Sequence, residues 1–199
     1  RYWNHVPKLN RERSRDRMTS VIGRGGEVFM NTYAQFPIVL EKGEGVYVYD
    51  QEGNKYLEFV AGIAVNGLGY NHEGLQQTLK DQVDKMTHCS NLYWNEPAVE
   101  AAELLVKYSE LDKIFFCNSG AEANEAAIKL VRRYIQKVKK EDVYEIVTFK
   151  QSFHGRTLAT LSATGQPHLQ EGFFPLVSGF RYLPFNDYDA IDRLSGQQT

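Results

Sequence analysis

The chain has 199 residues, of which 42% are hydrophobic and 24% charged, and this ordinary globular composition excludes a disordered or collagen-like protein. With 23 basic and 25 acidic residues the net charge is −2, so the molecule as a whole has no electrostatic reason to bind nucleic acid or an anionic membrane. No apolar run approaches the roughly 18 residues that a membrane-spanning helix needs, so we expect a soluble chain without a signal peptide.

Basic residues are concentrated at the start of the chain. The first 17 residues carry six basic side chains against Glu12 and Asp16, which leaves a charge of −6 on the remainder. We expect a flexible, solvated tail over residues 1–29. A mitochondrial presequence is an alternative because such segments are rich in arginine and serine, although the two acidic residues argue against it. A true start at Met18 is a second alternative.

Cysteine and histidine provide no sign of a disulfide framework or a metal centre. Cys89 and Cys117 have no spacing that would hold zinc, and the five histidines are scattered along the chain. We therefore expect a reducing compartment and no metal site.

Residues 30–95 are predicted to form a separate N-terminal lobe. Two β-rich runs at 46–49 and 55–59 flank a turn-forming cluster at 50–54, which predicts a hairpin. The glycine-rich stretch at 61–70 favours backbone packed closely against a neighbour rather than a regular element.

Two amphipathic helices are predicted next, over residues 73–88 and 97–108. Asn95 is a suitable cap for the second helix, and Pro97 suits its first turn.

Residues 96–199 are predicted to form the first part of an α/β domain. Strands are expected at 113–117, 143–149 and 180–183, and helices at 121–140 and 157–164. This alternation indicates a parallel sheet with helices on its faces. Because ligands bind beyond the carboxyl ends of such strands, the loops at 117–121 and 150–156 are the candidate site.

The junction between the first strand and the long helix has two interpretations. Ser119 followed by Glu122 forms a capping-box pattern, which is a purely structural role. Alternatively, Gly120 lets backbone amides at the helix N-terminus approach a phosphate, with the Ser119 hydroxyl as a further donor. Neither a Walker loop nor a dinucleotide-binding glycine motif is present.

The loop after the second strand carries an aromatic, a histidine and an arginine. Phe153 could stack on a planar ring and Arg156 could bind a carboxylate in two parallel bonds. Taken singly, Phe153 is more typical of a core residue, Arg156 of a surface charge, and His154 of a hydrogen-bonded residue. The coincidence of these groups beside a phosphate turn favours a ligand site.

Six dispersed motifs, in order and spacing, resemble the class III aminotransferases that use pyridoxal phosphate. They lie at 31–38, 43–45, 61–66, 90–93, 116–126 and 152–157. The resemblance runs from about Asn31 to the end of the chain and is nearest to the acetylornithine type. It implies an α/β fold of the fold-type I class, present here as the N-terminal lobe and the first part of the large-domain sheet.

The resemblance also implies roles for individual residues. Cofactor contacts are expected from Ser119, Gly120, Ala121 and Phe153. Many relatives have threonine where Ala121 lies, so a side-chain hydroxyl is absent at that position. Substrate contacts are expected from Arg156, which matches the arginine that binds the α-carboxylate, and from Tyr33. A catalytic role for His154 does not follow, because relatives differ at that position.

The activity implied is transfer of the terminal amino group of N-acetylornithine to 2-oxoglutarate, a step of arginine biosynthesis, in a cytoplasmic homodimer. Ornithine or 4-aminobutyrate as amine donor, a mitochondrial location, or a non-catalytic remnant of the family are the alternatives. Relatives are about twice this length. The resemblance therefore implies that the lysine that binds the cofactor and the aspartate at the pyridine nitrogen lie beyond Thr199. No catalytic residue and no activity are expected within the 199 residues alone.

Overall fold

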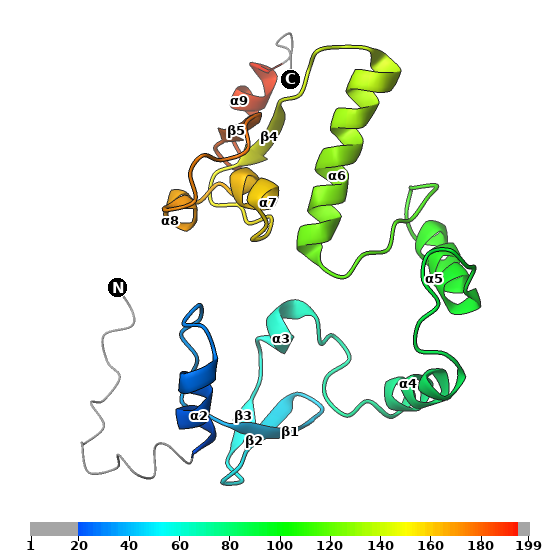
Figure 1. Cartoon of the computed structure of the whole chain (residues 1–199), viewed down its shortest axis with the longest axis vertical. Coiled ribbons are helices and arrows are strands. Elements are labelled where there is room, and N and C mark those ends of the chain that lie inside the picture. The colour runs from blue at the N-terminus through cyan, green and yellow to red at the C-terminus, as the bar shows by residue number, and fades with distance from the viewer. Residues whose placement is uncertain (1–19, 195–199) are drawn as a thin grey trace. The chain divides into compact units, whose positions relative to one another are not determined.

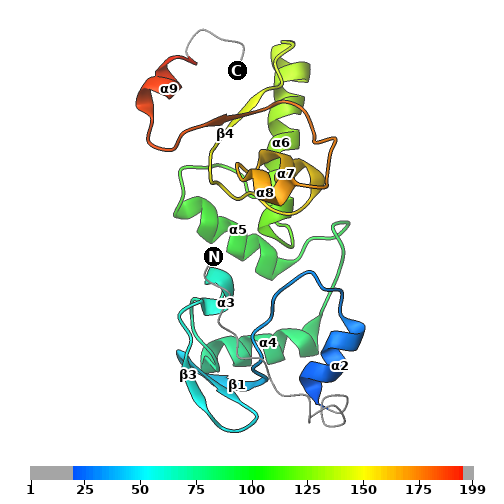
Figure 2. The same ribbon diagram turned by 90° about the vertical axis from the view of Figure 1, so that its left-hand side faces the viewer.

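The computed structural model describes residues 20–194, which divide into two compact units, one ending at Tyr93 and the other beginning at Trp94 (Figures 1 and 2). The expected charge-rich tail, the presequence and the alternative start concern mainly residues 1–19, which lie outside the described residues. Within residues 20–194 no helix has the length and apolar character needed to cross a membrane.

Part of the expected tail is helical. Helix α2 (Val21–Val28) begins where the Ser20 hydroxyl accepts a hydrogen bond of 3.0 Å from the Gly23 amide. Serine is a favoured N-cap because its oxygen satisfies an amide that the helix itself cannot. This helix differs from the expected tail, because three of its eight residues are glycine, which disfavours a helix in the sequence pattern.

The first unit contains an antiparallel three-stranded sheet with the order β1-β2-β3. Strands β2 (Tyr47–Asp50) and β3 (Lys55–Leu57) pair with Val48 opposite Tyr56, which confirms the predicted hairpin. Strand β1 (Leu40–Glu44) pairs with β2 and was not predicted. Its sequence, LEKGE, carries three charges and a glycine and lacks the β-branched residues typical of strands.

The turn of the hairpin is organised by Asp50, whose side chain is buried. Oδ1 accepts hydrogen bonds from the amides of Glu52 and Asn54, at 3.1 and 2.8 Å. Oδ2 accepts from Asn54 Nδ2 at 2.8 Å and from the Tyr56 hydroxyl at 2.7 Å. Burial alone would raise the pKa of Asp50, but these hydrogen bonds stabilise the carboxylate and the pKa lies below its usual value.

The glycine-rich stretch makes the close backbone approach expected of it. Gly69, at φ +73°, has no room for a Cβ atom, which would lie 2.5 Å from the carbonyl oxygen of Gly45. The short turn α3 (Ala61–Ala64) is left-handed, with φ of +60° at Gly62 and +63° at Ile63. Left-handed backbone costs roughly 1–2 kcal/mol for each residue other than glycine, so this turn is strained.

Helices α4 (Glu73–Lys85) and α5 (Glu96–Lys107) confirm two predicted helices. The Asn95 side chain accepts from the Ala98 amide at 3.3 Å, and proline lies in the first turn of α5, as expected. Helix α4 ends before the predicted residue 88, because Met86 is extended at φ −169° and ψ 122°.

The second unit has a parallel ladder as its centre. Strands β4 (Ile146–Phe149) and β5 (Phe180–Leu183) pair in parallel with Ile146 opposite Phe180, which confirms the predicted β-α-β order there. Helix α6 (Gly120–Tyr134) continues as a π-helical turn, η2 (Ile135–Lys139), so the predicted helix over 121–140 is confirmed in length. The shorter helices are α7 (Leu158–Ala163), α8 (Pro167–Gln170) and α9 (Tyr188–Asp192).

The strand predicted at 113–117 is absent from the structure, and this part of the α/β prediction is wrong for the described residues. Residues 113–117 form no regular element and have no strand partner within residues 20–194, and Phe115 and Phe116 are exposed. A strand needs a neighbour to accept its backbone hydrogen bonds, and an apolar sequence cannot supply that neighbour. Strand β4 likewise begins only at Ile146, where β5 starts to pair with it.

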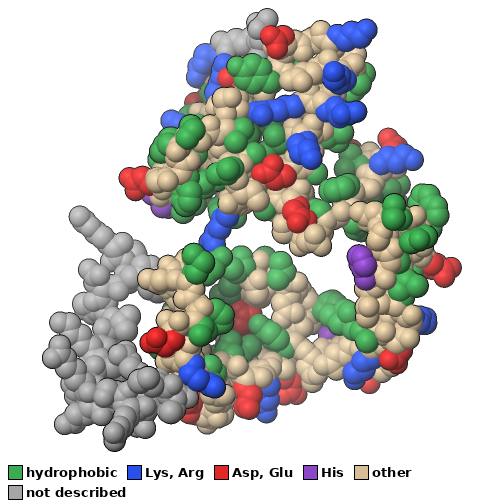
Figure 3. All heavy atoms as spheres, in the orientation of Figure 1, with side chains coloured by type: hydrophobic (Ala, Val, Ile, Leu, Met, Phe, Trp, Pro, Cys, Tyr) green, Lys and Arg blue, Asp and Glu red, His purple; other side chains and the backbone are tan. Residues whose placement is uncertain are grey.

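The core of the second unit lies around α7 and is unusually polar. Its most buried side chains include Thr160, Ser162 and Thr164. Gln170 is also buried, and its amide donates to the carbonyls of Leu161 and Thr164. Hydrophobic side chains are visible on the surface of the molecule (Figure 3).

Candidate functional site

The site begins at the N-terminus of α6. Ser119 is extended, at φ −154°, and its hydroxyl accepts from the Glu122 amide at 3.2 Å, which confirms the predicted cap. The returning half of the capping box differs from the pattern. The Glu122 carboxylate accepts from the Asn118 amide at 2.7 Å instead of from Ser119. Glu122 thereby fixes the residue that enters the turn.

Two amides of this turn remain available to a ligand. The hydrogen bonds at the turn engage the amides of Asn118, Glu122 and Ala123, and none involves the amides of Gly120 and Ala121 within residues 20–194. A Cβ atom placed on Gly120 would meet nothing within 4 Å, so there is open space beside this backbone. Unsatisfied amides and the helix dipole together favour an anion.

The second part of the site is the strand-end loop, residues 150–157, which follows β4. The Gly165 amide donates to the Ser152 hydroxyl at 3.2 Å, and Gln166 Nε2 donates to the Ser152 carbonyl at 3.0 Å. The His154 amide donates to Thr164 Oγ1 at 3.0 Å. The segment between α7 and α8 therefore holds this loop from one side.

Helix α6 holds the same loop from the other side, through contacts that we call the α6–loop junction. Asn124 Nδ2 donates to the His154 carbonyl oxygen at 2.8 Å, and the Thr157 hydroxyl donates to the Glu125 carboxylate. A Cβ atom on Gly155, which has φ +136°, would lie 2.8 Å from the Ala121 Cβ. The turn at the start of α6, residues 118–121, and the strand-end loop thus form one continuous site.

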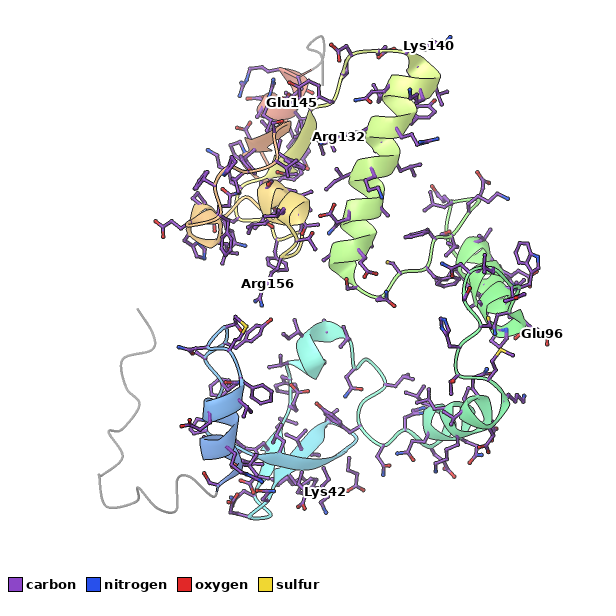
Figure 4. All side chains as sticks on the ribbon, viewed as in Figure 1. Lys42, Glu96, Arg132, Lys140, Glu145 and Arg156 are labelled. Atoms are coloured by element: carbon purple, nitrogen blue, oxygen red, sulfur yellow. The ribbon has the colours of Figure 1, made fainter. Side chains whose placement is uncertain are left out.

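The two candidate ligand-binding side chains of the loop, Phe153 and Arg156, face outward. The Phe153 side chain is 56% exposed, so its ring is available for stacking on a planar group. Arg156 is also exposed and extends outward from the loop that precedes α7 (Figure 4). Its guanidinium has the geometry to bind a carboxylate in two parallel bonds.

Ser119, Gly120, Ala121, Phe153 and Arg156 are the predicted residues that the structure brings together in one unit. Tyr33, the remaining candidate, is exposed in the unit that ends at Tyr93. His154 contributes backbone bonds to the loop.

Sequence reasoning missed three residues of the junction: Asn124, Glu125 and Thr157. All three lie within the motifs at 116–126 and 152–157, but only their hydrogen-bond partners in the structure show that they connect α6 to the loop. A weak signal was available for Asn124, because residues four apart share a helix face and Asn124 follows Gly120 by four.

Chemically, this arrangement suits a ligand with three parts. Two backbone amides and a hydroxyl can bind a phosphate, an exposed aromatic ring can cover a planar heterocycle, and a guanidinium can bind a carboxylate. Residues 20–194 contain no group of three or more histidine, cysteine or acidic side chains that could hold a metal ion.

Solved structures share this fold. The chain matches an ornithine aminotransferase from Toxoplasma gondii, crystallised with partial occupancy of PLP, with a TM-score of 0.84 and 26% identity, over 96% of this chain and 47% of that one. It matches an omega transaminase from Pseudomonas jessenii, in complex with PMP, with a TM-score of 0.77 and 29% identity, over 83% of this chain and 39% of that one.

Curated sequences extend the comparison. The acetylornithine aminotransferase of Caldanaerobacter subterraneus is 53% identical over 162 residues, which are 81% of this chain and 41% of that protein. The acetylornithine aminotransferase of Methanocaldococcus jannaschii is 48% identical over 170 residues, which are 85% of this chain and 43% of that protein. The chain thus spans less than half the length of these relatives.

The family model described as Aminotransferase class-III matches residues 28–198. The match includes both halves of the site, the α6 turn and the strand-end loop. The fold is accordingly that of the pyridoxal-phosphate-dependent aminotransferases of fold type I, of which these residues form a mixed α/β part. The chain belongs to the class III aminotransferase family.

Proposed function

We propose that this chain supplies the cofactor-holding part of an aminotransferase that uses pyridoxal 5'-phosphate to move the terminal amino group of N-acetylornithine to 2-oxoglutarate. The observation that carries the proposal is the continuity of the α6 turn with the strand-end loop, through Gly155 against Ala121. The names of relatives at 48 and 53% identity support the choice of amine donor.

The residues present fit the cofactor part by part. The free amides of Gly120 and Ala121, with the Ser119 hydroxyl beside them, would hold its phosphate in the open space next to Gly120. The exposed ring of Phe153 would stack on its pyridine ring. When bound, the cofactor supplies the electron sink for amino transfer, and the protein supplies grip and orientation.

Arg156 and Tyr33 are the proposed substrate residues. The Arg156 guanidinium would bind the α-carboxylate of the amino acid and so fix which end of the molecule points away from the cofactor. Tyr33 would help to position the same end. The homodimer, the cytoplasmic location and the place in arginine biosynthesis stay predictions.

The choice of donor is tested by steady-state kinetics of the purified holoenzyme, with glutamate formation from 2-oxoglutarate as the signal. We expect a higher kcat/KM with N-acetylornithine than with ornithine or 4-aminobutyrate. The structural match to an ornithine aminotransferase makes ornithine the second candidate. Equal or higher kcat/KM with free ornithine would transfer the assignment to that donor.

The roles of Arg156 and Phe153 are tested by separating substrate affinity from cofactor affinity. Arg156→Ala should raise KM for the amino acid roughly 10- to 100-fold, the value of charged hydrogen bonds, while the Kd for pyridoxal phosphate stays nearly unchanged. Arg156→Lys is the control, because lysine keeps the positive charge but cannot form the two parallel hydrogen bonds of a guanidinium. Equal losses in both constants would assign Arg156 a structural role.

Phe153→Ala should weaken pyridoxal phosphate binding about tenfold through the loss of ring stacking. Phe153→Leu is the matched control, because it keeps apolar bulk without an aromatic face. An unchanged Kd in Phe153→Ala would remove the stacking role.

A further inference from the structure

The two functional side chains of the strand-end loop are each held between anchored neighbours. Phe153 lies between Ser152, which bonds to Gly165 and Gln166, and His154. Arg156 lies between Gly155, which has no room for a Cβ atom beside Ala121, and Thr157, which bonds to Glu125. The loop itself lies outside the strands, so these anchors determine where its two side chains point.

Asn124 has a distinct position among these anchors. Its amide, at 2.8 Å from the His154 carbonyl oxygen, is the side-chain donor by which α6 reaches the backbone of the loop in the described residues. Asn124 lies one turn after Gly120 on the same helix. Its hydrogen bond to His154 therefore joins the start of α6 to the residue next to Phe153. Asn124 is half-buried, where a hydrogen bond is less exposed to competition from water.

We propose that Asn124 is a positioning residue that fixes the orientation of Phe153 relative to the amides of Gly120 and Ala121. The distance between the phosphate and the ring is constant in a rigid ligand. The Gly120 and Ala121 amides and the Phe153 ring must therefore keep a constant separation. The Asn124 bond provides that constancy, with the Thr157–Glu125 bond beside it. This inference rests on the proposed function, because it assigns Asn124 a role in the same cofactor site.

The chemistry of the bond selects the variants. Asn124→Asp has almost the same shape, but its carboxylate cannot donate and would face the His154 carbonyl oxygen. Asn124→Ala removes the donor without adding a charge and is read instead if the aspartate variant does not fold. Lys129→Ala is the matched control, since Lys129 is an exposed residue of the same helix.

Two ligands are titrated into the apoprotein prepared from the holoenzyme: pyridoxal phosphate directly, and inorganic phosphate as its competitor. Asn124→Asp should raise the Kd for pyridoxal phosphate about tenfold, the equivalent of one hydrogen bond, and leave the constant for inorganic phosphate unchanged. Amide exchange should rise in residues 150–157 and remain unchanged in α6. Lys129→Ala should change neither constant.

Each other outcome has a separate meaning. An unchanged Kd for pyridoxal phosphate in both Asn124 variants would overturn the positioning role, as would parallel losses for both ligands or failure of both variants to fold. Failure of the unaltered protein to bind pyridoxal phosphate would instead overturn the proposed function. The two failures are therefore distinguishable.

Discussion

The Asp50 turn and the α6–loop junction both rest on a polar side chain bonded to backbone, but they differ in range. Asp50 contacts partners no more than six residues away, in Glu52, Asn54 and Tyr56. Asn124 contacts a carbonyl thirty residues further along the chain. The turn can therefore form from its own segment, whereas the junction requires α6 and the loop after β4 to be packed together first.

Glycine shows the same contrast. Gly53, in the hairpin turn, has φ +83° and open space around a hypothetical Cβ, so only its backbone angle requires glycine. Gly155 has φ +136° and lacks room as well, because a Cβ atom would lie 2.6 Å from Thr160 Oγ1. A local turn needs backbone freedom, and a junction needs both freedom and space.

The largest effect is expected when the junction is filled. Gly155→Ala combines backbone strain with overpacking, each of the order of 1–3 kcal/mol, so the free energy of unfolding should fall by about 3 kcal/mol. Urea unfolding measures this loss. A titration of the same variant should show weaker binding of pyridoxal phosphate, because the loop is displaced from α6.

Gly172→Ala is the matched control for Gly155→Ala. Gly172 has φ +83°, but a Cβ atom there meets nothing within 4 Å. The free energy of unfolding of Gly172→Ala should fall only by the cost of backbone strain, about 1 kcal/mol, and its affinity for the cofactor should stay the same. Equal losses in the two variants would show that the lack of room beside Thr160 and Ala121 adds no cost of its own at Gly155.

A smaller loss of stability is expected when the pH is lowered, and this loss should be confined to the hairpin. The pKa of Asp50 is lowered in the folded turn because hydrogen bonds outweigh burial, so its contribution to stability is complete above the ordinary value of about 3.9. That contribution is lost as the pH falls through the lowered pKa. The bond from Asn124 to the His154 carbonyl contains no group that titrates in this range.

Amide exchange of Glu52 and Asn54 between pH 5 and about pH 2 measures this loss, after correction for intrinsic rates. Asp50→Asn is the control, because it cannot titrate and should show weaker protection that does not change with pH. Protection in the unaltered protein that persists unchanged below the Asp50 pKa would contradict the role assigned to its carboxylate.

The smallest effect is expected for Tyr56→Phe, which removes one of the four hydrogen bonds that the Asp50 carboxylate accepts. The pKa of Asp50 should move back toward its ordinary value, so acid loss of the turn should begin at a higher pH. The pKa of Tyr56 itself is raised, chiefly by its bond to Asp50. Its contribution is present below about pH 10 and is lost as the pH rises through the raised pKa.

The variant should therefore lose this alkaline dependence, which absorbance of tyrosinate can follow. An acid midpoint identical to that of the unaltered protein would show that the Tyr56 hydroxyl does not stabilise the Asp50 carboxylate. Because the bond lies within the turn, cofactor affinity should be the same in both proteins.

Features that depend on nearby residues could be predicted from the sequence. The hairpin at 47–57 has its turn signals between its strands, and α6 has both its cap and its apolar face within one segment. Residues 113–117 have the composition of a strand but no partner within the described residues, and composition says nothing of a partner. Strand β1 is the reverse case, because pairing with β2 makes a strand of a charged segment.

The candidate site divides in the same way. Gly120, Phe153 and Arg156 could be proposed from the sequence because their residue types suit phosphate, ring and carboxylate, and because the sequence predicts strands that end just before them. Asn124 and Glu125 could not, because asparagine and glutamate on a helix are ordinary surface residues until their partners in the loop are known. Long-range contacts of this kind arise only from the packed structure.

The most direct test of the account is a crystal structure of the holoenzyme with pyridoxal phosphate bound. We predict that the phosphate accepts hydrogen bonds from the amides of Gly120 and Ala121, and that the Phe153 ring lies against the pyridine ring. We also predict that the bond from Asn124 to the His154 carbonyl is retained. A phosphate bound away from the α6 turn, or a pyridine ring without contact to Phe153, would contradict it.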